Sequence, residues 1–210
     1  MAEKTIVHLL RHGEVHNPNA VLYGRLPGYH LSANGRQMAA AAAEFFSERP
    51  VVALFASPLE RAQETAKPVA ERLGLQIVTD DRLIESGNVL EGKTITLARL
   101  ALNPVNWRHL WNPFRPSWGE PYQQIGDRVW QVVERARDEA RGREAVAVSH
   151  QLPIWVTRLA AEHKRLWHNP SSRQCALGSV TSFTFDGDAL TSVSYAVPAR
   201  PQVREGDAAQ

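Results

Sequence analysis

Short apolar runs alternate along the chain with segments in which apolar residues recur at helical spacing. Residues 5–10, 51–56, 75–79 and 145–149 are runs of five or six residues rich in Val, Ile, Leu and Ala. Such runs are typical of strands buried on both faces of a sheet. Two more strands are predicted at 179–185 and 190–195, where Asp186-Gly187-Asp188 between them is a hairpin signal.

The intervening segments predict helices. Ser32 is a candidate N-cap for a helix that continues to about residue 48, and its alanine-rich body has high helix propensity. Ser57 and Glu60 resemble a capping box, with Pro58 at the first helical position and Gly74 as the stop. Apolar residues at helical spacing predict a third helix over about 125–142, and a fourth is expected over 151–161.

This alternation predicts an α/β fold, a three-layer sandwich in which helices flank a mainly parallel central sheet. We expect one domain over residues 1–197, with an irregular, aromatic-rich insertion at about 86–120 and a flexible tail at 198–210. Trp107, Trp111 and Trp118 lie in that insertion. They could form a substrate-facing lid, but we interpret them as packing the insertion onto the sheet.

Composition and charge exclude several function classes. The 210 residues carry a formal net charge of +2 and contain no block of like charges, so we expect neither nucleic acid nor a membrane surface as a partner. No export signal or membrane span is recognisable. Cys175 is the single cysteine, which suits a reducing, cytoplasmic environment and leaves no partner for a disulfide or a zinc knuckle.

Cationic and imidazole side chains follow three of the predicted strands. Arg11 and His12 end the first, Arg61 lies in the first turn of the helix after the second, and His150 follows the fourth. Ligands of open α/β sheets bind at the carboxyl ends of strands, so these side chains are expected to converge there. A helix N-terminus adds attraction for anions, and Gly13 lets backbone approach a ligand. The pattern therefore predicts a phosphate site.

Three motifs carry a family resemblance. They are residues 11–14 (RHGE), 57–66 (SPLERAQETA) and 148–150 (VSH). In this order and at these strand ends, they resemble the histidine phosphatase superfamily, in its phosphoglycerate-mutase-like branch, and the likeness spans about residues 5–195. The resemblance implies that His12 is a nucleophile that takes up the phosphoryl group. It also implies that Arg11, Arg61 and His150 clamp the phosphoryl oxygens and that Glu85 is the general acid.

Physical chemistry supports these roles independently. Phosphoryl transfer requires in-line positioning and stabilisation of charge on three oxygens, which fixed cations supply. Two guanidinium groups should lower the pKa of His12 and keep it unprotonated. Glu85 needs the opposite, a raised pKa that holds its proton until the ester bond breaks.

The chain departs from the family pattern at three points. Pro18 stands where an asparagine is usual, with Asn17 one residue early. The distance from Glu85 to Gly92 is one residue shorter than usual, which leaves Glu91 or Asp81 as alternative acids. Gln151-Leu152 replaces a usual glycine pair beside His150 and makes that wall bulkier.

Further candidates for substrate binding are Asn17, Tyr23, Arg25 and Gln151. The remaining histidines lack the spacing of metal ligands, so we expect no metal. His8 is interpreted as a core residue, and Cys175 as a small buried apolar residue. The other histidines are interpreted as structural or exposed: His16, His30, His109, His163 and His168.

The sequence therefore predicts a phosphatase that needs no metal or cofactor and hydrolyses a small-molecule phosphate ester. A cofactor-dependent phosphoglycerate-type mutase ranks lower, because such mutases are usually longer and carry a serine where this chain has Val15. A non-catalytic module that binds phosphorylated ligands and, more weakly, a metal-dependent hydrolase remain alternatives. Oligomeric state is not readable from the sequence, and a homodimer is one open possibility.

Overall fold

A six-stranded mixed sheet forms the centre of the protein. The computed structural model describes residues 4–88, 91–92 and 119–198. The strands are β1 (Lys4–Arg11), β2 (Val51–Ala56), β3 (Ile77–Thr79), β4 (Glu144–Ser149), β5 (Val180–Asp186) and β6 (Ala189–Ala196). Their order across the sheet is β3-β2-β4-β1-β5-β6. β3, β2, β4 and β1 are parallel neighbours, whereas β5 and β6 are antiparallel.

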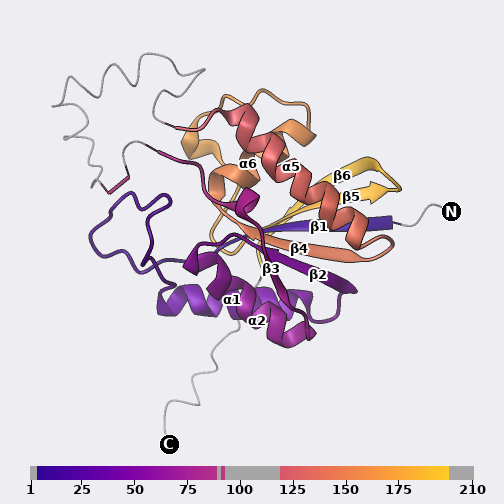
Figure 1. Ribbon diagram of the computed structural model, residues 1–210, viewed down its shortest axis with the longest axis horizontal. Helices are drawn as coiled ribbons and strands as arrows, with labels where there is room; N and C mark the ends of the chain where they lie inside the picture. Colours follow the sequence, from indigo (N-terminus) through magenta and orange to yellow (C-terminus); the bar gives the residue numbers. More distant parts are fainter. Residues whose placement is uncertain (1–3, 89–90, 93–118, 199–210) are drawn as a thin grey trace, which may run out of the picture.

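Helices cover both faces of this sheet, as Figure 1 shows. α1 (Ala33–Phe46) and α2 (Glu60–Leu73) pack together on one face, and α5 (Tyr122–Glu139) and α6 (Gln151–Ala161) pack together on the other. Two short 3-10 helices, η1 (Asp81–Leu83) and η2 (Pro170–Ser172), lie in the connections. The three-layer α/β architecture expected from the sequence is therefore present. The sheet is mixed, because β5 pairs antiparallel with both of its neighbours, β1 and β6.

Each face of the sheet buries its own apolar cluster. The α1/α2 side contains Phe46, Leu54 and Val146, and the α5/α6 side contains Phe55, Val129 and Phe183. Strands β1 and β4 lie in the middle of the sheet and are buried on both faces, which explains their nearly continuous apolar sequences. These strands give the residues at their carboxyl ends a rigid base.

Most element ends follow the predicted signals. The side chain of Ser32 accepts a hydrogen bond from the Gly35 backbone and caps α1. Gly74 ends α2 with φ of +66°, a left-handed conformation that glycine adopts without steric cost. Gly187 turns the β5–β6 hairpin with φ of +60°.

The capping box expected at Ser57 is wrong. α2 begins at Glu60 with Leu59 at its N-cap and no side-chain cap, so Pro58 precedes the helix. The Ser57 hydroxyl faces His150 instead, as described below.

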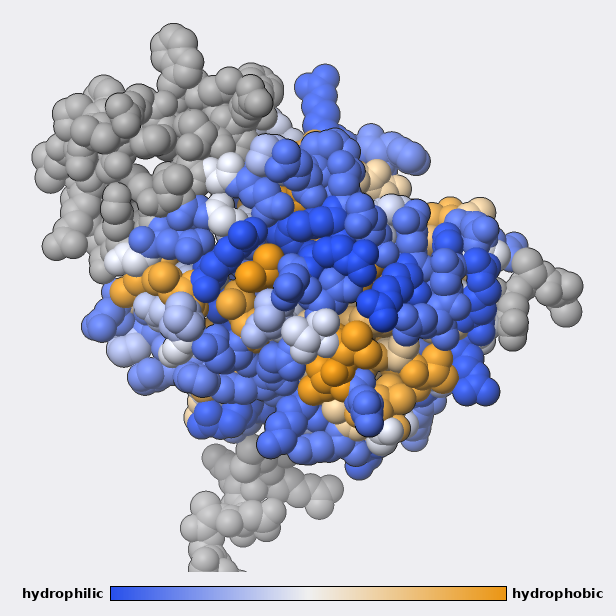
Figure 2. Space-filling view, viewed as in Figure 1, coloured by the Kyte–Doolittle hydropathy of each residue, from blue (hydrophilic) through white to orange (hydrophobic). Residues whose placement is uncertain are grey.

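The remaining sequence predictions fall partly outside the described residues. Asn88 and Gly119 form an antiparallel bridge that joins the two ends of the predicted insertion. Trp107, Trp111 and Trp118, and with them the choice between lid and packing, lie outside the described residues, as do His109 and most of the tail. Among the described residues, no helix is long and apolar enough to cross a membrane. The face shown in Figure 2 is mostly hydrophilic, with hydrophobic residues in separate patches.

Candidate active site

The carboxyl ends of β1 and β4 open into a cavity of about 320 Å³. Loop segments around residues 21–24, 85–88, 119–122 and 170–173 complete its walls, and Figure 1 shows the first of these, in indigo and purple, beside that end of the sheet. Arg11, His12 and Glu85 line the cavity together, although they come from distant parts of the sequence. The expected convergence at the strand ends is present.

His12 is held in one orientation at the floor of this cavity. Its side chain is buried, and Nδ1 lies 2.8 Å from the Gly13 carbonyl oxygen. That carbonyl can only accept, so Nδ1 carries the proton and Nε2 of the neutral ring keeps its lone pair. Burial, with the charges of Arg61 and Arg11, lowers the pKa of His12 to about 3. The ring is therefore unprotonated at neutral pH, and its Nε2 lone pair is available for nucleophilic attack.

Two arginines beside His12 offer unpaired donors. Arg61 is completely buried. It donates to the Gly24 carbonyl at 2.6 Å, while its Nε and second terminal nitrogen have no partner in the described part of the chain. Arg11 donates to the Cys175 carbonyl at 2.6 Å, and its Nε is buried, likewise without a partner among these residues. A buried donor without an acceptor costs free energy, so these groups are suited to an anion that enters the site.

His150 lies next to His12, with ring centroids 5.1 Å apart. Its Nε2 lies 2.8 Å from the Ser57 hydroxyl, and its Nδ1 is buried and has no partner among the described residues. The Ser57 hydroxyl accepts from the Leu59 amide at 3.4 Å and can donate its own proton to His150 Nε2. In that arrangement the ring carries its proton on Nδ1 and is a donor toward an anion. Burial, with lesser contributions from nearby charged groups, holds the pKa of His150 well below its usual value, so this ring is neutral.

Two carboxyl groups line this cavity, and Glu85 is the one without an arginine ion pair within the described residues, whereas Glu120 is paired with Arg25 and Arg128. Glu85 is half-buried, and desolvation raises its pKa although Arg61 and Arg11 act in the opposite direction. The alternatives lie elsewhere: Asp81 is exposed on η1, and Glu91 accepts from the Asn88 backbone outside the cavity lining. The geometry therefore favours Glu85 over both as the group that holds a proton for the leaving oxygen.

The four substrate-binding candidates divide into two pairs. Tyr23 and Gln151 line the cavity, and the Tyr23 ring lies 4.8 Å from the guanidinium carbon of Arg61. Asn17 and Arg25 do not line it. The Asn17 side-chain amide donates to the Val21 carbonyl and accepts from the Val21 amide. These two bonds close the loop after His12.

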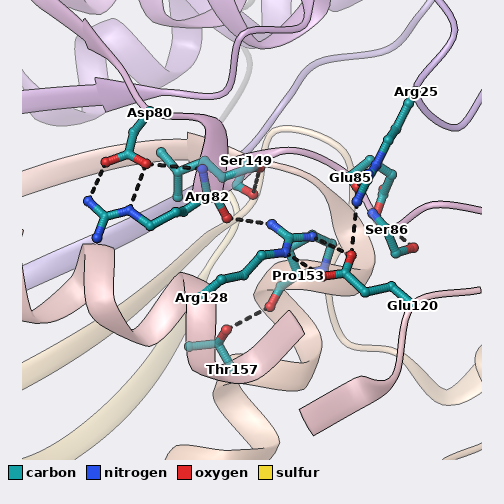
Figure 3. A network of polar contacts seen from close by, with 11 residues as sticks. Arg25, Asp80, Arg82, Glu85, Ser86, Glu120, Arg128, Ser149, Pro153 and Thr157 are labelled. Carbon is teal, nitrogen blue, oxygen red and sulfur yellow. Dashed lines mark hydrogen bonds and ion pairs between the residues drawn. The ribbon is translucent and has the colours of Figure 1, made fainter. Parts of the chain in front are cut away.

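Arg25 braces the cavity wall instead of facing the cavity. It donates to the Glu85 carbonyl at 2.7 Å and to the Glu120 carboxylate at 2.9 Å, which is shown in Figure 3. Glu120 is also held by Arg128, which further donates to the Arg82 carbonyl. The network fixes the backbone that carries Glu85, and the sequence analysis missed Glu120 and Arg128 as members.

Two glycines allow the nucleophile loop, the segment that directly follows His12, to approach the helix layer. A Cβ at Gly13 would lie 2.5 Å from the Gly35 oxygen, and a Cβ at Gly35 would lie 2.0 Å from the Glu14 oxygen. Both distances are far below contact, so neither position accepts a side chain without displacing backbone. The Gly13 amide also donates to the Thr65 hydroxyl at 3.1 Å, which ties this loop to α2.

The sequence analysis also missed two cavity residues, Tyr122 and Arg173. Both follow irregular segments whose path the sequence does not indicate. His168, interpreted above as structural or exposed, is half-buried and bonds to Arg173. His8 and Cys175 are buried as expected, and burial raises the pKa of the Cys175 thiol to about 11. Within the described part of the chain, no cluster of three or more His, Cys, Asp or Glu is arranged to hold a metal.

Comparison with known proteins places these features in a family. Residues 7–198 match the model of the histidine phosphatase superfamily, branch 1. The uncharacterized protein Rv0525 of Mycobacterium tuberculosis is 54% identical over 200 residues, which cover 95% of this chain and 99% of that protein. The probable phosphoglycerate mutase GpmB of Escherichia coli is 33% identical over 154 residues, 70% of each chain.

Solved structures share the fold. YhfR of Bacillus stearothermophilus superposes with a TM-score of 0.77 at 27% identity, covering 89% of this chain and 94% of that one. The mycobacterial glucosyl-3-phosphoglycerate phosphatase Rv2419c superposes with a TM-score of 0.73 at 25% identity, covering 94% of this chain and 98% of that one.

Proposed function

The chain belongs to the histidine phosphatase superfamily, branch 1, and we propose that it is a phosphatase that hydrolyses a small-molecule phosphate monoester through a phosphohistidine on His12. One observation carries the proposal. The unprotonated Nε2 of His12 lies among buried donors of Arg11, Arg61 and His150 that have no partner within the described residues. Such an arrangement suits a tetrahedral dianion more than any uncharged group.

In the first step, Nε2 of His12 attacks phosphorus and the bond to the ester oxygen breaks. The two arginines and the Nδ1 proton of His150 stabilise charge on the three transferred oxygens. Glu85 gives its proton to the departing oxygen, which leaves as an alcohol. The raised pKa of Glu85 keeps that proton available.

In the second step, the Glu85 carboxylate takes a proton from water, and the resulting nucleophile attacks the phosphohistidine. The phosphorus–nitrogen bond breaks, inorganic phosphate forms and His12 returns to its neutral state. The proton taken from water restores the acid form of Glu85, so the cycle closes without a metal.

Trapping the intermediate tests this proposal. The protein is incubated with a phosphate ester that is labelled on phosphorus, and the reaction is quenched rapidly with alkali. The protein should then carry a label that is stable to base and labile to acid. His12→Gln should abolish the label, whereas His30→Gln, a change at an exposed histidine outside the cavity, should retain it. Label that survives in His12→Gln would refute the proposal. Hydrolysis lost on chelation and restored by a metal would refute its metal-independent form.

A mutase is the second candidate, because a relative at 33% identity is named a probable phosphoglycerate mutase. A mutase would return the phosphoryl group from His12 to another oxygen of the substrate. Phosphate release and isomerisation of 3-phosphoglycerate, measured in parallel with and without bisphosphate primer, separate the two. Fast isomerisation with little phosphate release would favour the mutase.

A further inference from the structure

Arg173 brings a third guanidinium to the cavity, separate from those of Arg11 and Arg61. It lies just after η2 in the connection between α6 and β5, and it lines the cavity beside Tyr122 and Gln151. The residue is half-buried, and desolvation lowers its pKa. The steps proposed above assign no role to this cation.

Both side chains that hold Arg173 are uncharged. Its Nε donates to His168 Nε2 at 2.8 Å, and a terminal nitrogen donates to the Gln151 side-chain oxygen at 3.4 Å. His168 Nδ1 donates in turn to the Leu166 carbonyl at 2.7 Å, so the ring is neutral and its Nε2 is the acceptor. Within the described residues no carboxylate forms an ion pair with Arg173. These hydrogen bonds fix its position, and Glu85 acts on its charge only from beyond ion-pair distance.

An aromatic support holds this arrangement in place. The His168 ring stacks on Tyr122 with centroids 5.5 Å apart and meets the Trp155 ring edge-on at 6.0 Å. The side chain that orients Arg173 is therefore packed on two sides. A binding group positioned in this way loses little conformational entropy when its ligand arrives.

The charges of the cavity leave Arg173 without a counterpart even when a phosphoryl group is bound. Glu120, which lines the same cavity, is already paired with Arg25 and Arg128. A phosphate monoester carries at most two negative charges, which Arg11 and Arg61 match. Binding a substrate with one further negative charge would compensate the third arginine.

We propose that Arg173 forms a second anion subsite, which binds a carboxylate or second phosphate on the leaving-group side of the substrate. The inference rests on the proposed function for the first subsite and adds the class of ester that the protein prefers. With about 320 Å³ the cavity is at the small end of ligand sites, so the substrate is a small phosphorylated acid or bisphosphate.

The test is a three-carbon series of phosphate esters whose far end carries a hydroxyl, a carboxylate or a second phosphate. We expect kcat/KM to be roughly tenfold or more higher for at least one anionic member than for the hydroxyl member. The carboxylate and phosphate members distinguish the two anion types. Arg173→Met should bring the ratio of kcat/KM between the anionic and the hydroxyl member close to one. Arg165→Met, at an exposed arginine outside the cavity, should leave this ratio unchanged.

His168→Phe keeps an aromatic ring next to Tyr122 but removes the acceptor for Arg173. We expect this variant to lower the same ratio in part. A purely structural role of His168 would instead lower kcat/KM equally for all three esters.

Three results would overturn the inference: a ratio near one in the natural protein, a ratio retained in Arg173→Met, or equal losses for all three esters in that variant. Equal losses would mean that Arg173 binds the transferred phosphoryl group. Equilibrium binding of the three esters to His12→Gln protein gives the ratio without turnover. Absence of hydrolysis would therefore refute the proposed function, while the binding ratio would still decide on Arg173.

Discussion

Individual side chains at the cavity owe their chemistry to neighbours that set their protons. The Gly13 carbonyl holds the proton of His12 on Nδ1, and a Ser57 hydroxyl that donates to His150 Nε2 leaves the proton of that ring on Nδ1. One imidazole is thereby an acceptor toward the site and the other a donor. Burial among arginines keeps both rings neutral, and desolvation raises the pKa of the Glu85 carboxyl.

The loss of activity in Glu85→Gln should therefore depend on the leaving group of the substrate. Alkyl phosphates need a proton on the departing oxygen, so we expect kcat to fall by roughly 100-fold or more. p-Nitrophenyl phosphate leaves as a stable anion and should lose much less. Asp81→Asn, at the exposed carboxyl of η1, is the control and should retain activity on both esters. Equal losses on the two substrates in Glu85→Gln would contradict the role of an acid.

The pH profile follows from the same groups. A raised pKa means that Glu85 loses its proton at higher pH than an ordinary carboxyl, so kcat on alkyl phosphates should decline as pH rises through that value. Protonation of His12 should not cause an acid limb until the pH approaches its pKa of about 3. Glu85→Gln should remove the decline at high pH, and any limb that remains belongs to the substrate. A profile for the natural protein that shows no decline with rising pH would contradict this assignment.

Ser57→Ala tests the orientation of the His150 proton. Without the hydroxyl, the hydrogen bond to Nε2 is lost and the proton is no longer fixed on Nδ1, so we expect kcat to fall by roughly tenfold with a smaller change in KM. Ser57→Thr retains a hydroxyl and should retain more of the activity. Rates for Ser57→Ala equal to those of the natural protein would show that the hydrogen bond has no catalytic role.

At the scale of elements, the contact of α1 with the nucleophile loop determines where His12 lies. Glycine at both Gly13 and Gly35 lets this loop and the first turn of α1 approach closely. The Ser32 cap and the Glu14 side chain, which accepts from the Ser32 hydroxyl at 2.6 Å, join the same two elements. The loop and the helix therefore form one packed unit.

The same substitution at two helical glycines should have opposite effects on stability. Gly35→Ala places a Cβ 2.0 Å from the Glu14 oxygen and should lower the free energy of unfolding by about 1–3 kcal/mol or more, with loss of activity. In Gly126→Ala the new Cβ would lie 3.5 Å from its nearest neighbour, a Val156 side-chain carbon. The higher helix propensity of alanine should therefore raise the free energy of unfolding by about 0.5–1 kcal/mol. Urea unfolding measures both. A tolerated Gly35→Ala would show that the loop can move.

At the scale of the whole molecule, a buried ionic group joins strands at the centre of the sheet. Glu144 on β4 accepts from His8 Nε2 on β1 at 2.9 Å and lies 3.5 Å from Arg49. His8 also bonds to Ser182 on β5 at 2.7 Å. Although burial alone would raise the pKa of Glu144, the hydrogen bond and charges of these partners lower it overall.

The direction of that shift gives a prediction for acid stability. A carboxyl whose pKa is lower in the folded than in the unfolded protein stabilises the fold above its unfolded value of about 4.5. That contribution is lost as pH falls through the lower, folded value. Glu144→Gln should flatten the loss of stability below about pH 4.5, as measured by urea unfolding at a series of pH values. Glu71→Gln, at an exposed carboxylate of α2, should leave the slope unchanged.

The elements and the motif residues could be predicted from the sequence alone. Apolar runs and helical spacing identified the strands and helices because burial selects residue type locally. The strand-end positions of Arg11, His12, Arg61 and His150 indicated one anion site, because carboxyl ends of parallel strands meet at one edge of a sheet.

Tertiary structure decided what depends on the paths of irregular segments. Arg25, Asn17 and Arg173 lie in segments without local periodicity, so their roles are visible only in the folded chain. Arg25 supports the cavity wall, Asn17 closes a loop, and Arg173 lines the cavity. Ser57 likewise had a sound local reading as a helix cap, yet it bonds to a histidine 93 residues away. A sequence pattern records which face a residue buries, whereas the partner of a polar side chain is fixed only when distant segments pack.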